Sequence, residues 1–168
     1  PVTFTASRGG YSVELTYTFK PDYQIDVTGR LTGLGPNGGL VLVSLGHGLR
    51  NAEADSVQNE RAYGFVVKDN EAHRNDFTKL KAGVPDVVSG PFEWVAVKSK
   101  YFVTGLFAFD SSSTSGRIAG VTALAPADAG KHPSTALVRA SVPVPVSGAL
   151  AWSVYAGPME HPLLARIG

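Results

Sequence analysis

The chain has 168 residues, no cysteine and a formal net charge of +1. Its length corresponds to one domain, and the missing cysteine excludes a disulfide scaffold, a thiolate zinc site and a cysteine nucleophile. The near-neutral charge gives no electrostatic basis for binding nucleic acid or an anionic membrane surface. No apolar run is long enough to span a bilayer. Together with 19 glycines and 11 prolines, these features indicate a turn-rich globular β protein.

The first half of the chain alternates apolar and polar side chains, as half-buried strands do. Residues 11–20 and 24–31 both alternate, and the turn residues Pro21 and Asp22 separate them, which predicts an antiparallel hairpin. Residues 40–45 are a continuous apolar run, which predicts a strand covered on both faces. The charged stretch 50–81 is predicted to contain one strand, at 62–68, and otherwise to be a solvated excursion over the sheet edge.

The second half of the chain returns to strand patterns and ends on a helical one. Two closely spaced prolines, Pro143 and Pro145, lack N–H donors on the same lateral side, which predicts an edge strand. The apolar spacing after Gly157 and Pro158 predicts a short helix over 158–168. Because this pattern still runs at Gly168, we expect the native chain to continue. Strands are predicted at residues 92–97, 101–110, 117–125, 136–146 and 149–155.

About nine short strands and one terminal helix predict a single β-sandwich domain over residues 1–168. Because the chain starts within strand-like sequence, we expect it to be a segment of a longer protein.

The four histidines do not stand at spacings that bring two ligands to one metal from a single element. The plain interpretation of each is a surface or loop residue, and these residues are His47, His73, His132 and His161. We therefore predict no metal site.

Nucleophile and phosphate-binding motifs are incomplete. Ser44 lacks the glycine that a nucleophile elbow needs two positions earlier, where Leu42 stands. Gly130-Lys131 is followed by His132 instead of the Ser or Thr of a phosphate loop. The sequence therefore predicts no catalytic residue and no cofactor. Two hypotheses remain: a groove that binds an extended peptide or a sugar, and a rigid spacer or docking module of a larger protein.

Two strings carry a family resemblance. Trp94-Val95-Ala96-Val97-Lys98-Ser99-Lys100-Tyr101-Phe102 resembles the Trp-x-Ala-x-x-x-Lys-Tyr-Phe segment in the large periplasmic domain of the YidC membrane protein insertase family. Val154-Tyr155-Ala156-Gly157-Pro158, followed by Leu163 and Leu164, is similar to the Tyr-x-Gly-Pro segment of that family. The resemblance covers residues 94–168 and is thin before them. Met159-Glu160-His161 departs from the lysine-led stretch that is more usual there.

The resemblance implies a β-super-sandwich of the galactose-mutarotase type, with a C-terminal helix leading toward a transmembrane segment. It implies the periplasm of a Gram-negative bacterium and tethering by flanking transmembrane helices that this chain lacks. Implied partners are Sec translocon components and nascent inner-membrane proteins, with the domain as a non-catalytic accessory. The matching residues carry structural roles only: Trp94, Lys100, Tyr101, Phe102, Tyr155, Gly157, Pro158, Leu163 and Leu164.

The terminal residues Leu163, Leu164 and Ile167 are expected to pack on the sandwich and to orient the next membrane helix. The fold likeness to mutarotases also raises an enzyme hypothesis, which would use His47 or His73. That hypothesis needs a histidine and a carboxylate in one concave face, and the sequence identifies no such pair. Fold alone does not carry function.

Overall fold

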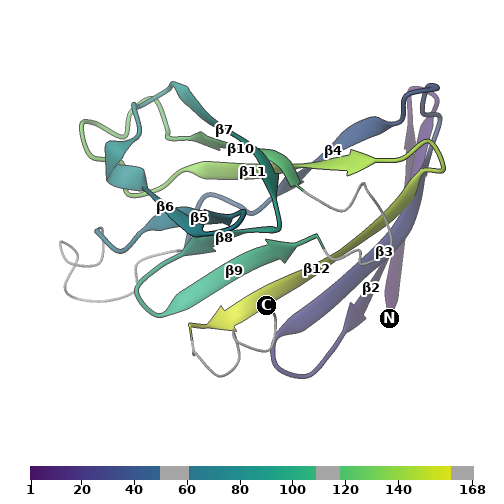
Figure 1. Ribbon diagram of the computed structural model, residues 1–168, viewed down its shortest axis with the longest axis horizontal. Coiled ribbons are helices and arrows are strands. Elements are labelled where there is room, and N and C mark those ends of the chain that lie inside the picture. The colour runs from purple at the N-terminus through teal and green to yellow at the C-terminus, as the bar shows by residue number, and fades with distance from the viewer. Residues whose placement is uncertain (50–60, 109–117, 160–168) are drawn as a thin grey trace.

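The computed structural model describes residues 1–49, 61–108 and 118–159, which form strands and one short 3-10 helix in two antiparallel sheets (Figure 1). The larger sheet has eight strands in the order β1(Val2–Arg8), β2(Tyr11–Phe19), β3(Gln24–Thr32), β12(Ala149–Pro158), β9(Phe102–Phe107), β8(Trp94–Lys98), β5(Gly64–Lys68) and β6(Ala72–Asp76). The smaller has four, in the order β4(Gly39–Ser44), β11(Leu137–Val144), β10(Ile118–Leu124) and β7(Pro85–Phe92).

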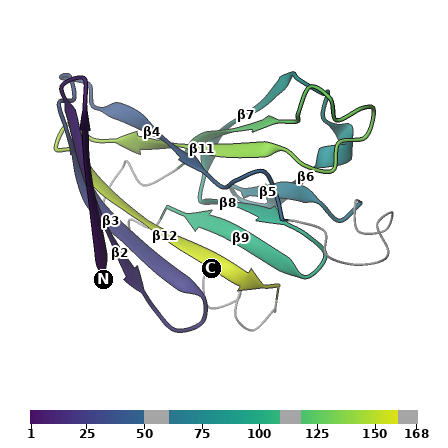
Figure 2. The ribbon, with the colours of Figure 1, turned by 180° about the vertical axis from the view of Figure 1, so that it is seen from behind.

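The two sheets lie over each other, as both ribbon views show (Figures 1 and 2). The main core of buried side chains lies between them. Phe65 and Leu106 of the large sheet are fully buried, as are Val121 and Val138 of the small sheet. The alternation of apolar and polar residues along each strand supplies this face, because successive side chains point to opposite sides. The predicted mainly-β architecture is therefore confirmed.

A second, smaller cluster lies on the opposite, outer face of the large sheet. It consists of Ala96, Val103, Phe107 and Tyr155, with Trp94 packed against it. In β8 the inner positions Val95 and Val97 alternate with these outer ones. Strands β8, β9 and β12 are thus buried on both faces, while the rest of the outer face is more polar.

The predicted hairpin of the first half is confirmed. β2 and β3 pair antiparallel from Ser12 opposite Thr32 to Phe19 opposite Ile25. Between them Asp22 and Tyr23 both adopt left-handed backbone conformations, with φ of 61° and 62°. The predicted strand at 40–45 is present as β4, but the prediction that both of its faces are covered was wrong. β4 is an edge strand, and its Leu40 and Leu42 are 62% and 61% exposed.

The charged middle of the chain holds more structure than the sequence predicted. Strand β6 pairs with β5, and a 3-10 turn, η1(Phe77–Lys79), follows it. Phe77 is fully buried, and its backbone N–H donates to the carbonyl of Tyr63. The stretch 61–81 is therefore anchored to the sheet. Residues 50–60 of the predicted excursion lie outside the described residues. Strand β7 was also missed.

The predicted edge strand at Pro143 was wrong, since β11 lies between β4 and β10. The pairing with β10 reaches only Ser141 opposite Gly120, whereas the pairing with β4 continues through Pro143 to Val144. Pro143 thus lies where the described pairing is one-sided, which explains how an inner strand tolerates a residue without an N–H.

The predicted helix does not begin at Pro158, because Pro158 is the last residue of β12 and pairs with Phe102. Met159 is not helical, and 160–168, the remainder of the predicted helix, lie outside the described residues. In the three described stretches, no helix has the length and apolar character needed to cross a membrane.

Candidate functional site

The two strings that carry the family resemblance lie side by side in the structure. Strand β9, which starts at Phe102, pairs with β12, so that Val103 lies opposite Gly157 and Phe102 opposite Pro158. Just beyond the pairing, the backbone N–H of Met159 donates to the carbonyl of Tyr101 at 2.6 Å. Strands far apart in sequence therefore fix the path of the chain at the end of β12.

A tight turn between β8 and β9 presents Tyr101 for this contact. Ser99 is 7% exposed, and its hydroxyl oxygen accepts from the Phe102 N–H at 3.0 Å. The Ser99 N–H donates to the carbonyl of Phe102 at 2.8 Å. At the tip, the Lys100 ammonium lies 5.0 Å from the centre of the Tyr101 ring, a cation–π distance. The Lys-Ser-Lys-Tyr-Phe sequence thus builds a closed turn.

Tyr155 explains why glycine and proline follow it in the second string. Its ring is 1% exposed, and its hydroxyl donates to the carbonyl of Pro158 at 2.6 Å. A Cβ on Gly157 would lie 2.9 Å from that hydroxyl and 2.7 Å from Cγ of Tyr23. The Tyr23 ring meets the Tyr155 ring edge-on at 6.3 Å, and the Tyr23 carbonyl accepts from the Ala156 N–H. Gly157 is therefore required by this close approach.

An apolar pocket of about 160 Å³ lies on the outer face beside this turn. Gly105 leaves space at its floor, because a Cβ there would lie 2.8 Å from the Phe107 ring. The Trp94 and Phe107 rings are neighbours, with centroids 6.1 Å apart. The lining residues are Val66, Trp94, Ala96, Lys98, Val103, Gly105, Phe107, Tyr155 and Met159.

Two polar groups stand out in this apolar setting. The indole N–H of Trp94 is buried and has no hydrogen-bond partner among the described residues. The Lys98 ammonium donates to the carbonyl of Ala62 at 3.4 Å. Partial burial lowers the pKa of Lys98, and the nearby charge of Arg74 lowers it further. The pocket therefore has an apolar body, one unused donor and a cation.

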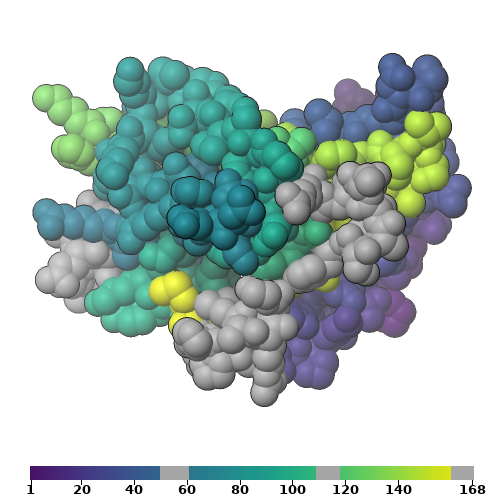
Figure 3. All heavy atoms as spheres, viewed as in Figure 1, coloured from purple at the N-terminus to yellow at the C-terminus, as the bar shows by residue number. Residues whose placement is uncertain are grey.

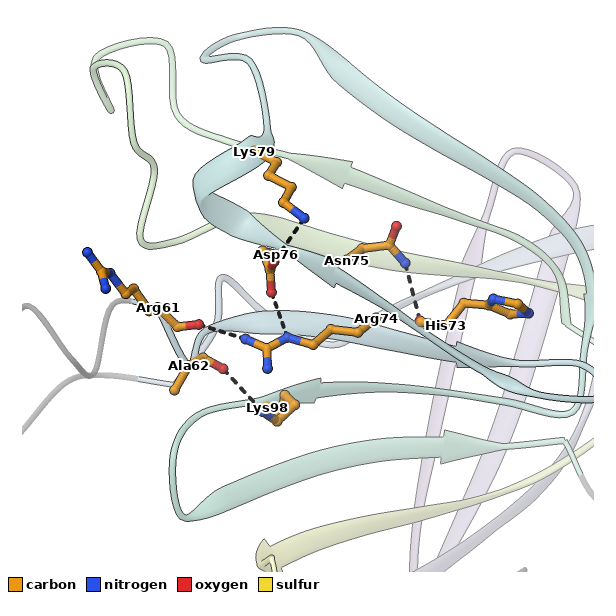
Figure 4. A network of polar contacts seen from close by, with 8 residues as sticks. All are labelled: Arg61, Ala62, His73, Arg74, Asn75, Asp76, Lys79 and Lys98. Carbon is orange, nitrogen blue, oxygen red and sulfur yellow. Dashed lines mark hydrogen bonds and ion pairs between the residues drawn. The ribbon is translucent and has the colours of Figure 1, made fainter.

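A charged network covers the neighbouring sheet edge (Figure 4). The Arg74 guanidinium donates to Asp76 and to the carbonyl of Arg61, both at 2.6 Å, and the Lys79 ammonium lies 3.2 Å from Asp76. Burial alone would raise the pKa of Asp76, but the hydrogen bonds from Lys79 and Arg74 outweigh it and hold this pKa below its usual value. A hollow of about 430 Å³ adjoins the network and is also lined by Lys81 and Asp86. The negative charges of the carboxylates and the positive charges of the cations that line this hollow largely cancel.

The remaining candidates from the sequence are scattered. His73 is exposed on β6 and lies 3.2 Å from Asp69. His47 follows β4 of the small sheet, and its carbonyl accepts a hydrogen bond from the N–H of Ala136, which directly precedes β11 of the same sheet. Among the residues that the structure describes, no group of three or more His, Asp or Glu could hold a metal ion. Leu163 and Leu164 lie outside the described residues.

Tyr23 is the site residue that sequence reasoning missed. It occupies a turn between two strands, and only the neighbouring Pro21-Asp22 marks that turn in the sequence. Its role depends on β12, which lies more than a hundred residues away along the chain, so no local pattern could reveal it.

Two comparisons with known proteins identify the family of this chain. The model of the YidC periplasmic domain family matches residues 1–168. One curated relative, the membrane protein insertase YidC of Chlorobaculum tepidum, is 31% identical over 99 residues, which cover 56% of this chain and 17% of that protein. The chain thus spans about a sixth of the length of this relative. The chain belongs to the YidC periplasmic domain family.

Proposed function

We propose that this domain is the periplasmic, non-catalytic module of an inner-membrane protein insertase in a Gram-negative bacterium, where it acts as a docking or spacer element. Family membership supports this proposal. The observation that carries it is the meeting of both family strings at the end of β12, where the chain leaves the large sheet. A fixed direction of the chain at this point would be useful in a domain that is anchored through its C-terminal side.

The geometry at the end of β12 suits a rigid spacer. Two hydrogen bonds fix the last described residues of the chain. The Tyr155 hydroxyl donates to the carbonyl of Pro158, and the Tyr101 carbonyl accepts from the N–H of Met159. A buried tyrosine that bonds its own strand end leaves little freedom for the next residue. The domain would therefore pass its orientation to the segment that follows, which the resemblance links to a transmembrane helix.

The apolar pocket gives the following segment a place to pack. Its volume of about 160 Å³ lies well below the ~300–1,000 Å³ of small-molecule sites, so it suits one large apolar side chain. Met159 lines it, and Leu163 and Leu164 come shortly afterwards in the chain. We expect these leucines to pack against the outer face, so replacing either by alanine should lower the free energy of unfolding by ~2–5 kcal/mol.

Urea unfolding of the two leucine variants tests this packing. Phe102→Ala is the matched control, because Phe102 lies at the same site but is 54% exposed, and its loss should be small. Unchanged midpoints for both leucine variants would contradict the packing of the segment.

The docking role is tested in the complete insertase. We expect affinity purification of the whole membrane protein to recover Sec translocon components, and deletion of residues 1–156 to reduce that recovery. Insertion of nascent inner-membrane proteins would be followed in the same strains. A Gly157→Ala variant of the whole protein separates a lost docking surface from a lost orientation. Equal recovery with and without the domain would contradict the docking role.

A second candidate is a periplasmic module that binds carbohydrate or peptide. The unused indole N–H of Trp94 beside an apolar pocket favours it, because a bound carbonyl or hydroxyl could satisfy that donor. The small volume favours a peptide side chain over a sugar chain. Calorimetric titration with short leucine-containing peptides and with oligosaccharides would test this, and no heat at millimolar ligand would exclude both.

A further inference from the structure

The two edges of the large sheet differ in how they are protected. The β6 edge has the sequence Ala-His-Arg-Asn-Asp, and its side chains form ion pairs, including Arg74 with Asp76. Charged residues on an edge strand are a common way to block pairing with another chain. The β1 edge, Val-Thr-Phe-Thr-Ala-Ser-Arg, has no charged side chain before Arg8.

Strand β1 is also exposed along its whole length. All seven residues are exposed, with Val2 and Phe4 at 46% and 61%. Among the described residues only β2 pairs with it, so every second residue turns its backbone groups away from the sheet. The purple N-terminal strands accordingly lie at the rim of the molecule (Figures 1 and 3). Strand β4, an edge of the small sheet, is shorter and turns alternate residues toward the core.

The two faces of β1 have different chemistry. Val2, Phe4 and Ala6 lie on the face that continues the core side of β2, where Phe4 packs edge-on against Tyr17 at 5.6 Å. The other face carries hydroxyls that pair with those of β2, Thr3 with Thr16 at 2.9 Å and Ser7 with Ser12 at 2.7 Å. A strand that joins this edge must therefore present one apolar face and one hydroxyl-bearing face.

We propose that β1 pairs antiparallel with β1 of a second copy of this chain, which joins two large sheets into one continuous sheet. The two pockets described above lie elsewhere, at β8, β9 and β12 and beside β6, so neither lies at this edge to select a foreign peptide. The identical strand supplies both the right alternation and the right length. Side chains alternate between the two faces of a strand with a period of two. In an antiparallel pair related by a two-fold axis, the apolar faces of both strands therefore lie on one side of the joined sheet and the hydroxyl-bearing faces on the other.

The register follows from pairing all seven residues of β1. Residue 2 then lies opposite residue 8 of the second copy, which puts Thr5 on the two-fold axis opposite Thr5 of the second copy. Phe4 lies opposite Ala6, so each exposed phenylalanine gains an apolar neighbour. The two Arg8 side chains lie at opposite ends, and no like charges face each other.

The chain contains no cysteine, so single cysteines report this register directly. Thr5→Cys would place two thiols opposite each other with Cα atoms about 4.5–5.5 Å apart, which is within disulfide range. Ser7→Cys is the matched control on the same strand and face, because its two copies would lie four residues, or about 13 Å, apart. We expect Thr5→Cys to form a disulfide dimer under mild oxidation, and Ser7→Cys to do so only when mixed with Thr3→Cys.

A charge substitution tests the interface without a covalent bond. Thr5→Lys puts two ammonium groups against each other at the axis and should raise the dimer dissociation constant roughly tenfold or more, measured by sedimentation equilibrium. His73→Lys, on the opposite edge, should leave that constant unchanged. Far-ultraviolet circular dichroism confirms that each variant is folded, which is expected at exposed positions.

The outcomes decide the proposal in each case. A monomer at every concentration, or equal cross-linking of Thr5→Cys and Ser7→Cys, would overturn it. The same cysteines are also placed in the complete insertase in membranes. Capture of a different protein by Thr5→Cys, without the homodimer, would replace the second copy by another extended partner and overturn the pairing proposed here.

Discussion

The two ends of the large sheet are built from similar strands but are buried in different ways. At the end formed by β5, β8, β9 and β12, the inner face packs on the small sheet and the outer face carries its own apolar cluster. At the end formed by β1 and β2, Val13 and Leu15 reach only the margin of the core and β1 is exposed throughout. Both family strings belong to the first end. The two segments that carry the resemblance seen in the sequence therefore lie at the end that is buried on both faces.

The largest expected effect comes from the same substitution at the two ends. Phe65→Ala removes a fully buried ring between the sheets and should lower the free energy of unfolding by ~3–5 kcal/mol. Phe4→Ala removes a ring that is 61% exposed and touches Tyr17 edge-on, so its loss should be about 1 kcal/mol. Urea denaturation measures both. Similar losses would contradict the contrast in burial between the two ends of the large sheet.

An intermediate effect is expected at the end of β12. The methyl group of Gly157→Ala would lie 2.7 Å from Tyr23 and 2.9 Å from the Tyr155 hydroxyl, and the backbone there must shift to relieve these contacts. We expect a loss of ~1–3 kcal/mol, measured by thermal or urea unfolding. Gly35→Ala is the control, because a Cβ there meets no atom within 4 Å. Equal stability of the two variants would show that the doubly buried end tolerates movement at its exit.

The sequence predicted most strands because their burial follows a period of two. It predicted the β2–β3 hairpin on this basis, whereas both strands of the first family string were predicted from their aromatic-rich, strand-favouring composition. It failed at β6, where Arg74 and Asp76 form a sheet edge through ion pairs that a hydrophobic pattern does not register. It failed again at β4, because an apolar run does not show which sheet, if any, will cover each face.

The candidate site was predictable in part. The two strings could be recognised as a pair, but their contact could not, because Met159 bonds Tyr101 through backbone groups that leave no trace in side-chain types. Tyr23 shows the same limit. Its left-handed backbone is unusual for an aromatic residue and is compensated by packing on Tyr155, which only the folded chain provides.

The smallest expected effect lies where the two ends join, between β3 and β12. Asp26 of β3 forms an ion pair with Lys20 and accepts a hydrogen bond from the Ser153 hydroxyl of β12 at 2.7 Å. The hydrogen bond from Lys20, followed by that from Ser153, lowers the pKa of Asp26 below its ordinary value of 3.8. The folded state therefore favours the carboxylate. The resulting stabilisation is complete above the unfolded-state pKa and is lost as the pH falls through the folded-state pKa.

Asp26→Asn should remove this part of the acid sensitivity. Because both partners are partly exposed, we expect a difference below about 1 kcal/mol at neutral pH, and a flatter dependence of stability on pH below about 4. Urea unfolding between neutral and acidic pH measures the slope, with Asp86→Asn as a control that lacks this ion pair. An identical slope for Asp26→Asn and the unchanged chain would mean that the carboxylate does not hold β3 to β12. The two ends of the sheet would then be joined by backbone pairing and core packing alone.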